Sequence, residues 1–405
     1  GVDVDAATAR GIIVMNTPGT SAIAAGEHTL TLMLALSRRL VQAHNGMKEG
    51  FWLMDRRRQA GTQLDGKTLG IVGLGRVGRI VAYRALAFGM TVLACDPYLS
   101  EDQLGDERVF LVGLRELLER SDFVSLHVPA TNETTGLINA ERLEQMKAGA
   151  RLINTGHGGA IDESALAEAL QSGRLAGAAV DVFAEEPPYH SALIGMENVI
   201  HTPHIGDNTV EAAQDLSFQI ARQVLDALNG TDYRNAVNMP FMPGADFETV
   251  QPYLSLGERM GMLLHVLARS AITRIAVELR GDDMQGMIKP VTVAMLKGIL
   301  TPILGESVSY INAPLLAAER GMQITQAKHL PTSDSYANLL SAQVTLADGE
   351  DIVMAGTLLD RKTPHIVQIN QYRMNFVPEG HMLVMGSYDR PGVIGRVGTL
   401  MAENA

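Results

Sequence analysis

Cysteine is almost absent from this sequence, and positive charge is scarce relative to negative charge. Cys95 is the single cysteine among 405 residues. One thiol cannot form a disulfide within the chain, and it cannot build a cysteine-ligated zinc site. We therefore expect no metal centre, and we expect a reducing compartment such as the cytoplasm.

Lysine and arginine total 33 against 45 aspartates and glutamates, a formal net charge of -12. Nucleic-acid-binding proteins normally carry clustered basic residues that neutralise backbone phosphates. The one basic triplet, Arg56–Arg58, is more typical of a solvated loop or a helix edge. We therefore predict no nucleic-acid partner.

Long apolar runs and a leader segment are also missing. Charges interrupt the longest apolar stretches well short of the ~20 residues that a membrane span needs, and no basic-then-apolar leader opens the chain. The sequence thus predicts no membrane span. The chain begins at Gly1 without a methionine and stops at "MAENA" after a helical pattern, so we expect a piece of a longer protein, truncated at both ends.

What the sequence does contain, from Leu69 to about His204, is an alternation of short Val-, Ile- and Leu-rich runs with amphipathic stretches. This pattern is typical of βαβ units around a buried parallel sheet, so we predict an α/β, doubly wound (Rossmann) domain. The predicted strands are "LGIVGLG", "TVLACD", "FVSLHV", "RLINT", "AGAAVDVF" and "NVIHTP". The predicted helices between them are "RIVAYRALAFG", "LRELLERS", "INAERLEQMKAG" and "DESALAEALQSG".

The flanking segments predict further helices and a second folded region. One long helix is predicted over "AAGEHTLTLMLALSRRLVQAHNGMKEG", and another over "NTVEAAQDLSFQIARQVLDALNG". Near residue 240 an α+β region begins with the helix "YLSLGERMGMLLHVLARS" and the strand "ITRIAVELRG". It continues with a helix at about 291–303, a hairpin turning at Asp348-Gly349, a final strand "HMLVMGSYD" and a helix starting at Pro391.

Three glycines, Gly73, Gly75 and Gly78, follow the first predicted strand and open a predicted helix. In that context a tight turn and a helix N-terminus can face a pyrophosphate. Asp96 closes the next strand, where a carboxylate would accept both ribose hydroxyls and repel a 2'-phosphate. The motif therefore predicts a dinucleotide site that prefers NAD to NADP.

Glu186 and His204 each lie just past a predicted strand, in "DVFAEEPP" and "HTPHIG". Open α/β sheets bind ligands at this edge, and histidine suits proton transfer because its pKa lies near 7. Removing the proton of a hydroxyl during hydride transfer needs such a base. Taken alone, a Glu and a His at strand ends are more often structural. His127, in "LHVP", is assigned no catalytic role.

In order and spacing, these motifs resemble the D-isomer-specific 2-hydroxyacid dehydrogenase family, and within it the long-type D-3-phosphoglycerate dehydrogenases. The resemblance covers nearly the whole chain. The matching segments include "GVDVDAATARGI", "GIVGLGRVGR", "HVPATNETTGLIN", "GGAIDESAL", "DVFAEEPP", "HTPHIG", "INAPLLAAERG", "VPEGHMLVM" and "DRPGVIGRVGTL".

The resemblance implies a domain order. It comprises a substrate-domain remnant (1–20), an NAD-binding Rossmann domain (21–206), a returning helix and linker (207–239), an α+β intervening domain of the allosteric substrate-binding type (240–380) and a truncated ferredoxin-like ACT domain (381–405). The ACT domain implies an amino-acid effector such as serine, with Asp389 as its candidate contact. The family also implies a homo-oligomer.

The resemblance further implies the roles of individual residues. His204 is the implied acid/base, Glu186 its carboxylate partner, and Asp181 the residue that holds the nicotinamide carboxamide. The implied pyrophosphate contacts are the amides of Arg76 and Val77, and further cofactor contacts are implied at Val128, Thr155, Gly156 and Gly206.

The sequence departs from the family at the substrate side. His157 stands where the family has its carboxylate-binding arginine, Ser21 where it usually has asparagine, and Asp207 adds negative charge after "HIG". An arginine offers a fixed cationic fork, whereas histidine is mostly neutral at pH 7. Losing one partner of a buried charge pair costs about 2 to 5 kcal/mol, which slows turnover roughly 30-fold to several thousand-fold.

Three functional readings remain open at this point. The first is NAD-dependent oxidation of 3-phosphoglycerate to 3-phosphohydroxypyruvate, the entry to serine biosynthesis. The second is a related dehydrogenase with an altered substrate or reduced activity. The third is a regulatory protein that binds NAD and an amino acid without turnover. The alternative to a change of substrate is that the substitutions at His157, Ser21 or Asp207 are neutral and leave the function unchanged.

Overall fold

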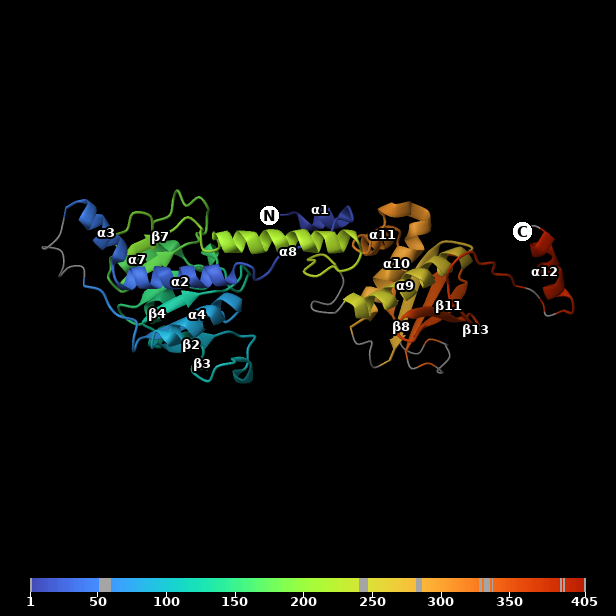
Figure 1. Cartoon of the computed structure of the whole chain (residues 1–405), viewed down its shortest axis with the longest axis horizontal. Coiled ribbons are helices and arrows are strands. Elements are labelled where there is room, and N and C mark those ends of the chain that lie inside the picture. The colour runs from blue at the N-terminus through green and yellow to red at the C-terminus, as the bar shows by residue number, and fades with distance from the viewer. Residues whose placement is uncertain are drawn as a thin grey trace. The chain divides into compact units, whose positions relative to one another are not determined.

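The computed structural model describes residues 2–50, 60–239, 247–281, 286–327, 330, 336, 338–386, 388 and 390–403. The chain forms two compact units, each built around its own sheet (Figure 1). One unit is Thr17–Arg222, and the other joins Gly1–Asn16 to Gln223–Ala405.

The first unit contains a seven-stranded sheet in the order β3-β2-β1-β4-β5-β6-β7, and every strand pair in it is parallel. All six predicted strands are present, so the doubly wound fold is confirmed. The strands are β1 (Thr68–Val72), β2 (Thr91–Cys95), β3 (Val109–Leu111), β4 (Phe123–Leu126), β5 (Arg151–Asn154), β6 (Gly177–Val180) and β7 (Val199–His201). Only β3 was not predicted, because this edge strand has three residues and exposes Phe110.

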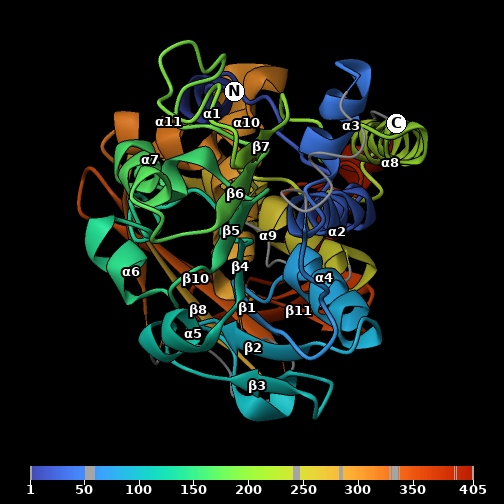
Figure 2. The ribbon, with the colours of Figure 1, turned by 90° about the vertical axis from the view of Figure 1, so that its left-hand side faces the viewer.

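Helices cover both faces of this sheet, as Figure 2 shows. One face carries α2 (Ala22–Ser37) and α4 (Arg76–Ala87), whose apolar side chains meet Ile71, Phe123 and Ile153 of the sheet. The other face carries α5 (Leu114–Arg120), α6 (Ala140–Gln145) and α7 (Glu163–Gln171). The remaining elements that begin in this unit are α3 (Leu40–Lys48), the short 3-10 helices Glu101–Gln103 and Gly158–Ala160, and α8 (Val210–Leu228).

The prediction of a single long helix before the sheet is wrong. The structure has two helices, α2 and α3, and the chain turns at Arg39, whose φ of 50° is left-handed. A residue outside the helix takes the last carbonyl of α2, because Thr62 donates its amide to the Ser37 carbonyl oxygen at 2.9 Å. Gly61 also lies against Arg38, where a β-carbon would come within 2.8 Å of the Arg38 α-carbon. A returning segment thus replaces the next helical turn.

The second unit is built on a mixed sheet in the order β13-β12-β11-β10-β8-β9. The predicted hairpin is confirmed, because β10 and β11 pair antiparallel on either side of Asp348-Gly349. The strands are β8 (Ile272–Arg280), β9 (Gln323–Gln326), β10 (Leu339–Leu346), β11 (Asp351–Leu359), β12 (Thr363–Ile369) and β13 (Tyr372–Phe376). The helices are α1 (Val4–Ala9), α9 (Phe247–Leu267), α10 (Ile288–Leu304), α11 (Ala313–Glu319) and α12 (Val393–Glu403), with a short 3-10 helix at Gly305–Ser307.

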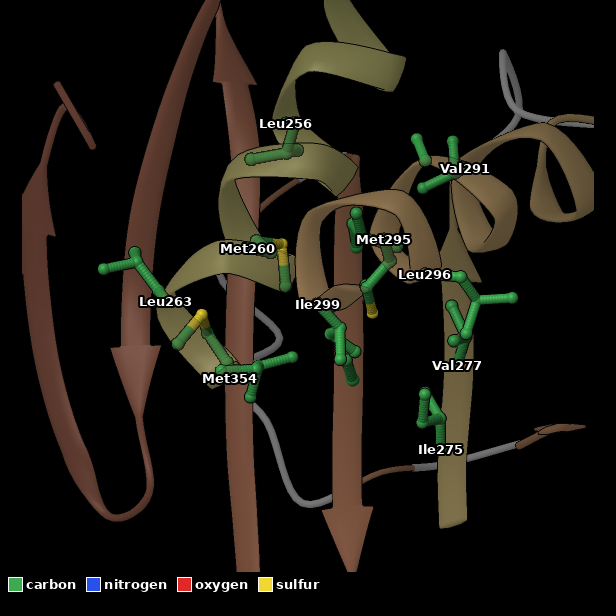
Figure 3. Packing of buried hydrophobic residues seen from close by; sticks show 14 of the residues in the cluster. Leu256, Met260, Leu263, Ile275, Val277, Val291, Met295, Leu296, Ile299 and Met354 are labelled. Atoms are coloured by element: carbon green, nitrogen blue, oxygen red, sulfur yellow. The ribbon is translucent and has the colours of Figure 1, made fainter. Parts of the chain in front are cut away.

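The core of this unit lies between its sheet and the helices α9 and α10 (Figure 3). The two helices pack closely because glycines meet backbone at their crossing: a β-carbon at Gly298 would lie 2.0 Å from the Glu258 carbonyl oxygen. Among the described residues, Ile288–Ser307 is long and apolar enough to cross a membrane by length and composition. Lys289 and Lys297 interrupt this segment, in agreement with the expectation from the sequence, and half of its apolar window is buried in the core of this unit.

The end of the chain departs from one prediction. Residues 381–386, within the predicted strand "HMLVMGSYD", have no regular secondary structure, whereas α12 begins soon after Pro391 as predicted. Asp389, the candidate effector contact, and the basic triplet at 56–58 lie outside the described residues.

Candidate active site

Every predicted cofactor and catalytic side chain described in the first unit, apart from Ser21, follows a strand of the parallel sheet. Because the strands are parallel, the segments after β1, β2, β4, β5, β6 and β7 all leave the same edge. Ligands of open α/β sheets bind outside this carboxyl edge. The strand order also reverses between β1 and β4, where such folds open a crevice.

The glycine-rich turn after β1 has the shape that a pyrophosphate needs. Gly73 has a φ of 91°, and a β-carbon there would lie 2.6 Å from the His127 carbonyl oxygen. A β-carbon at Gly78 would lie 2.2 Å from the Gly73 oxygen, whereas Gly75 faces open space. Only glycine fits at positions 73 and 78, and the open space at Gly75 leaves room for a ligand to approach the backbone.

The first turn of α4 starts directly after Gly75, so the amides of Arg76 and Val77 have no acceptor within the helix. Such amides and the positive end of the helix attract phosphate oxygens. Asp96 braces this turn from β2, accepting the Leu74 amide at 2.9 Å through Oδ2 and the Tyr98 amide at 3.0 Å through Oδ1. The residues present therefore fit NAD.

The other predicted cofactor residues take up places near this turn. Val128 Cγ1 lies 3.2 Å from the position a β-carbon at Gly73 would take. Gly156 approaches the end of β4, where a β-carbon would lie 2.9 Å from the Leu126 oxygen. Thr155 is committed to the scaffold instead, because its hydroxyl lies 2.7 Å from the hydroxyl of buried Thr29 on α2.

Glu186 and His204 are in direct contact. His204 Nδ1 lies 2.8 Å from Glu186 Oε2, and the Phe183 amide donates to Glu186 Oε1 at 3.1 Å. His204 has a left-handed φ of 52°, and its amide donates to the Asp181 carbonyl at 2.9 Å. Since the carboxylate accepts from Nδ1–H, the other ring nitrogen, Nε2, is left to exchange a proton.

The pair shifts the pKa of both partners. Burial alone would raise the pKa of Glu186, but hydrogen bonds from His204 and the Phe183 amide outweigh it and hold that pKa below its ordinary value. The hydrogen bond to Glu186 raises the pKa of His204 against the effect of burial, and the charges of Asp181 and Asp207 act in the same direction. The arrangement is that of an oriented histidine base with a carboxylate partner.

Asp181, expected to hold the nicotinamide carboxamide, fastens the turn that carries His204. Its carboxylate is buried, with the Ile205 amide at 3.0 Å and the Thr202 hydroxyl at 2.5 Å from Oδ1, and the Gly206 amide at 2.8 Å from Oδ2. His28 of α2 adds Nε2 at 3.3 Å from Oδ1. The chain's own donors thus occupy both oxygens. A contact of Asp181 with a cofactor stays a prediction, as does one of Gly206.

His157 lies in a tightly held turn that follows β5. Buried Asn154 donates its side-chain amide to the His157 carbonyl at 2.9 Å and accepts the Gly156 amide at 3.1 Å. The next residue, Gly158, contacts the main chain of Phe183, which holds Glu186. The half-buried His157 ring has no hydrogen bond in the described part of the chain.

Ser21 caps α2 without a side-chain hydrogen bond to that helix. Two residues earlier, Gly19 lies against the Arg76 side chain, where a β-carbon would come within 2.9 Å of Arg76 Cδ. The structure also reveals residues that the sequence reasoning missed, namely Glu163, His28 and Asn154. Each contacts backbone or a buried carboxylate. Glu163 lies in the motif "GGAIDESAL" and Asn154 in the predicted strand "RLINT", but neither motif indicated these contacts.

The chain matches two family models over most of its length. The NAD binding domain of the D-isomer specific 2-hydroxyacid dehydrogenases matches residues 30–206. The D-3-phosphoglycerate dehydrogenase intervening domain matches residues 249–370. The first match contains the glycine-rich turn and the Glu186–His204 pair, and the second contains α9, α10 and most of the mixed sheet.

Relatives and solved structures agree with these matches. D-3-phosphoglycerate dehydrogenase of Archaeoglobus fulgidus is 41% identical over 100% of this chain and 76% of its own, and that of Bacillus subtilis is 38% identical with the same coverage. The crystal structure of D-lactate dehydrogenase from Aquifex aeolicus with NAD and lactic acid has a TM-score of 0.52 at 34% identity, covering 57% of this chain and 73% of its own. The TT0316 protein of Thermus thermophilus has a TM-score of 0.54 at 40% identity, covering 58% and 75%. The chain therefore belongs to the D-isomer-specific 2-hydroxyacid dehydrogenases, NAD-dependent oxidoreductases acting on CH-OH donors, in the branch of the D-3-phosphoglycerate dehydrogenases.

Proposed function

We propose that the chain oxidises 3-phosphoglycerate to 3-phosphohydroxypyruvate with NAD, the first step of serine biosynthesis. The observation that carries this proposal is the contact of 2.8 Å between His204 Nδ1 and Glu186 Oε2 at the sheet edge that carries the glycine-rich turn. The substrate follows from the name shared by relatives about 40% identical over the whole chain.

Each residue has a defined task in this reaction. NAD, when bound, supplies the hydride acceptor. His204 Nε2 removes the proton of the substrate's C2 hydroxyl and returns it in the reverse direction. Glu186 holds the ring through Nδ1 and stabilises the imidazolium form once the proton has been taken. Gly73, Arg76 and Asp96 hold the cofactor in reach through the shape of the turn and the backbone amides.

The direct test is a steady-state assay of NADH formation from NAD and 3-phosphoglycerate, repeated backwards with 3-phosphohydroxypyruvate. His204→Ala should lower kcat by about 100-fold to 10,000-fold while NADH still binds. His44→Ala, which removes an exposed histidine of α3, is the matched control and should keep full activity. A wild-type chain that binds NADH but turns over neither acid contradicts the proposal.

A second candidate is oxidation of a different 2-hydroxy acid. His157 replaces the cation that fixes the substrate carboxylate, and the charge of Asp207 acts on His204, which disfavours a strongly anionic substrate. A panel of 2-keto acids assayed with NADH separates this candidate from the first. Turnover of a less anionic acid at least about 10-fold above that of 3-phosphohydroxypyruvate would favour it.

The intact His204–Glu186 pair favours an enzyme over a silent NAD-binding regulator, because a sensor has no need of an oriented base.

We extend the proposal to the domain order 1–20, 21–206, 207–239, 240–380 and 381–405, a homo-oligomer and an amino-acid effector such as serine acting through an ACT domain. A cytoplasmic location fits the single free thiol, Cys95. Analytical ultracentrifugation and serine titration of the activity test the oligomer and the effector.

A further inference from the structure

We propose that Glu163 positions the catalytic Glu186–His204 pair by fastening both ends of the loop 184–191 to the start of α7. Glu163 is the first residue of that helix. Its Oε1 accepts the Ala184 amide at 2.8 Å, and its Oε2 accepts the Ser191 hydroxyl. One carboxylate therefore ties down the beginning and the end of the segment that carries Glu186.

The local sequence leaves the Glu163 side chain available for this contact. Asp162, the residue before it, caps α7 by accepting the Ala165 amide at 3.0 Å. The Asp162 amide donates to the Ile138 carbonyl at 3.0 Å, so the main chain at the helix start is also fixed. With the cap supplied by Asp162, the neighbouring carboxylate can reach outward. Hydrogen bonds to a carboxylate acceptor are stronger than those to a neutral one.

Apolar burial contributes little to holding the first half of the loop in place. Residues 184–187 are exposed, so burial of apolar side chains does not fix this stretch. The far end is better anchored, because the Ser191 oxygen that donates to Glu163 also accepts the Leu193 amide at 3.3 Å, and Leu193 is fully buried. The clamp thus links an exposed loop to the core through Ser191.

The link from the clamp to the catalytic pair is short. Ala184 follows Phe183, whose amide donates to Glu186 Oε1 at 3.1 Å. The second carboxylate oxygen of Glu186 meets His204 Nδ1 at 2.8 Å. If the Ala184 amide were released, Phe183 and Glu186 would lose their fixed distance from His204. The hydrogen bond that orients the base would then form only part of the time.

Two substitutions separate positioning from a general structural role. Glu163→Ala removes both acceptors and should lower kcat by about 10- to 100-fold while the Kd for NADH changes less than about 3-fold. Glu163→Gln can still accept from Ala184 and can donate to Ser191, so it should keep kcat within about 3-fold of the wild type. Glu168→Ala removes an exposed carboxylate from the same helix and should change nothing.

The second readout is the titration of the His204 ring, followed by NMR of the assigned imidazole carbon. In Glu163→Ala its midpoint should move to lower pH, because the hydrogen bond to Glu186 is the largest influence that raises the pKa of His204. Asp181 and Asp207, whose charges also act on the ring, are unchanged and should keep part of the shift. Ser191→Ala, which removes one of the two contacts, should give a smaller change in the same direction.

This inference rests on the proposed function for its kcat readout only. The His204 titration and NADH binding need no substrate, so a wild type that is silent with 3-phosphoglycerate defeats the proposed function and leaves the clamp testable. A Glu163→Ala protein with the wild-type titration midpoint overturns the clamp. So does one that loses NADH binding together with kcat. If Glu163→Ala does not fold, Ser191→Ala decides, and an unshifted midpoint there overturns the proposal.

Discussion

Gly158 lies so close to Phe183 that a β-carbon on it would come within 1.9 Å of the Phe183 carbonyl oxygen. The turn after β5 and the loop after β6 therefore touch main chain to main chain. Because the Phe183 amide also donates to Glu186, any side chain at position 158 would displace Phe183 and so disturb the acid/base pair. His157, at the family's arginine position, belongs to the same turn.

Gly158→Ala should therefore displace Phe183 and misplace Glu186. We expect kcat to fall at least about 10-fold, and unfolding to become easier by about 1 to 3 kcal/mol because backbone must move to admit the methyl group. Gly113→Ala is the matched control, since no atom lies within 4 Å of a β-carbon there. Steady-state kinetics and chemical denaturation measure the two effects. An unchanged kcat in Gly158→Ala would contradict this contact.

His157→Arg should raise kcat/KM for 3-phosphoglycerate, because it restores a cationic fork for the substrate carboxylate. The gain expected from a buried charge pair is about 30-fold or more. His157→Lys supplies the charge without the planar fork and should gain less. If the arginine variant is no faster than the native chain with any acid tested, His157 does not limit turnover.

Glu186→Gln should change the pH profile of the reaction as well as its rate. Oxidation needs neutral His204, so kcat/KM rises as pH increases through the pKa of this residue. Glu186 raises that pKa, so in the variant the rise should move to lower pH, with a plateau about 10-fold or more below that of the wild type. In the direction of keto-acid reduction, which needs protonated His204, activity should be lost at a lower pH than in the wild type. A profile that keeps its midpoint would show that Glu186 does not act on His204.

Asp96→Asn should weaken discrimination between NAD and NADP. The carboxylate braces the glycine-rich turn by accepting the amides of Leu74 and Tyr98, and an Asn side chain keeps one acceptor while it removes the negative charge. We expect the ratio of Kd values for NADPH and NADH to fall by about 10-fold, with kcat for NAD little changed. Fluorescence titration with both nucleotides measures the ratio. Asp65→Asn, at the amino edge of the sheet, is the control.

His127 should make the protein sensitive to mild acid. Burial lowers the pKa of His127 to about 4, and its Nδ1 is buried without a partner among the described residues. Since the unfolded chain binds a proton there near pH 6.5, the free energy of unfolding should fall as pH drops from about 6.5 to about 4, by about 3 kcal/mol from this group. His127→Leu should flatten that slope relative to wild type. His44→Leu, which removes an exposed histidine, should leave the slope as it is.

The predictable part of the site is the part written in continuous sequence. Gly73, Gly78 and Asp96 follow apolar runs that the alternating pattern predicts to be buried strands, so the strand-turn-helix motif locates them without tertiary information. Glu186 and His204 could be placed at the correct sheet edge for the same reason. Their contact could not be derived from spacing, because it depends on how the loops after β6 and β7 fold toward each other.

The clamp at Glu163 and the closure of the turn by Asp181 escaped sequence reasoning for a different reason. About half of their partners are backbone amides, which every residue except proline carries, so the residue types in the sequence do not mark these contacts. The break between α2 and α3 has a similar origin. Positions 38 and 39 are both arginine, so no glycine or proline marks the end of the helix. The helix ends where the distant Thr62 amide takes the Ser37 carbonyl.

The burial of the Asp181 carboxylate also sets the tolerance of this region to changes in length. Three donors between Thr202 and Gly206 converge on two oxygen atoms, and the spacing of those donors along the chain is what brings His204 to Glu186. Adding or deleting a single residue in that stretch would move the donors out of step with the carboxylate. Homologues that retain His204 and its chemistry should therefore keep the number of residues from position 202 to position 206, even where other side chains in this stretch differ.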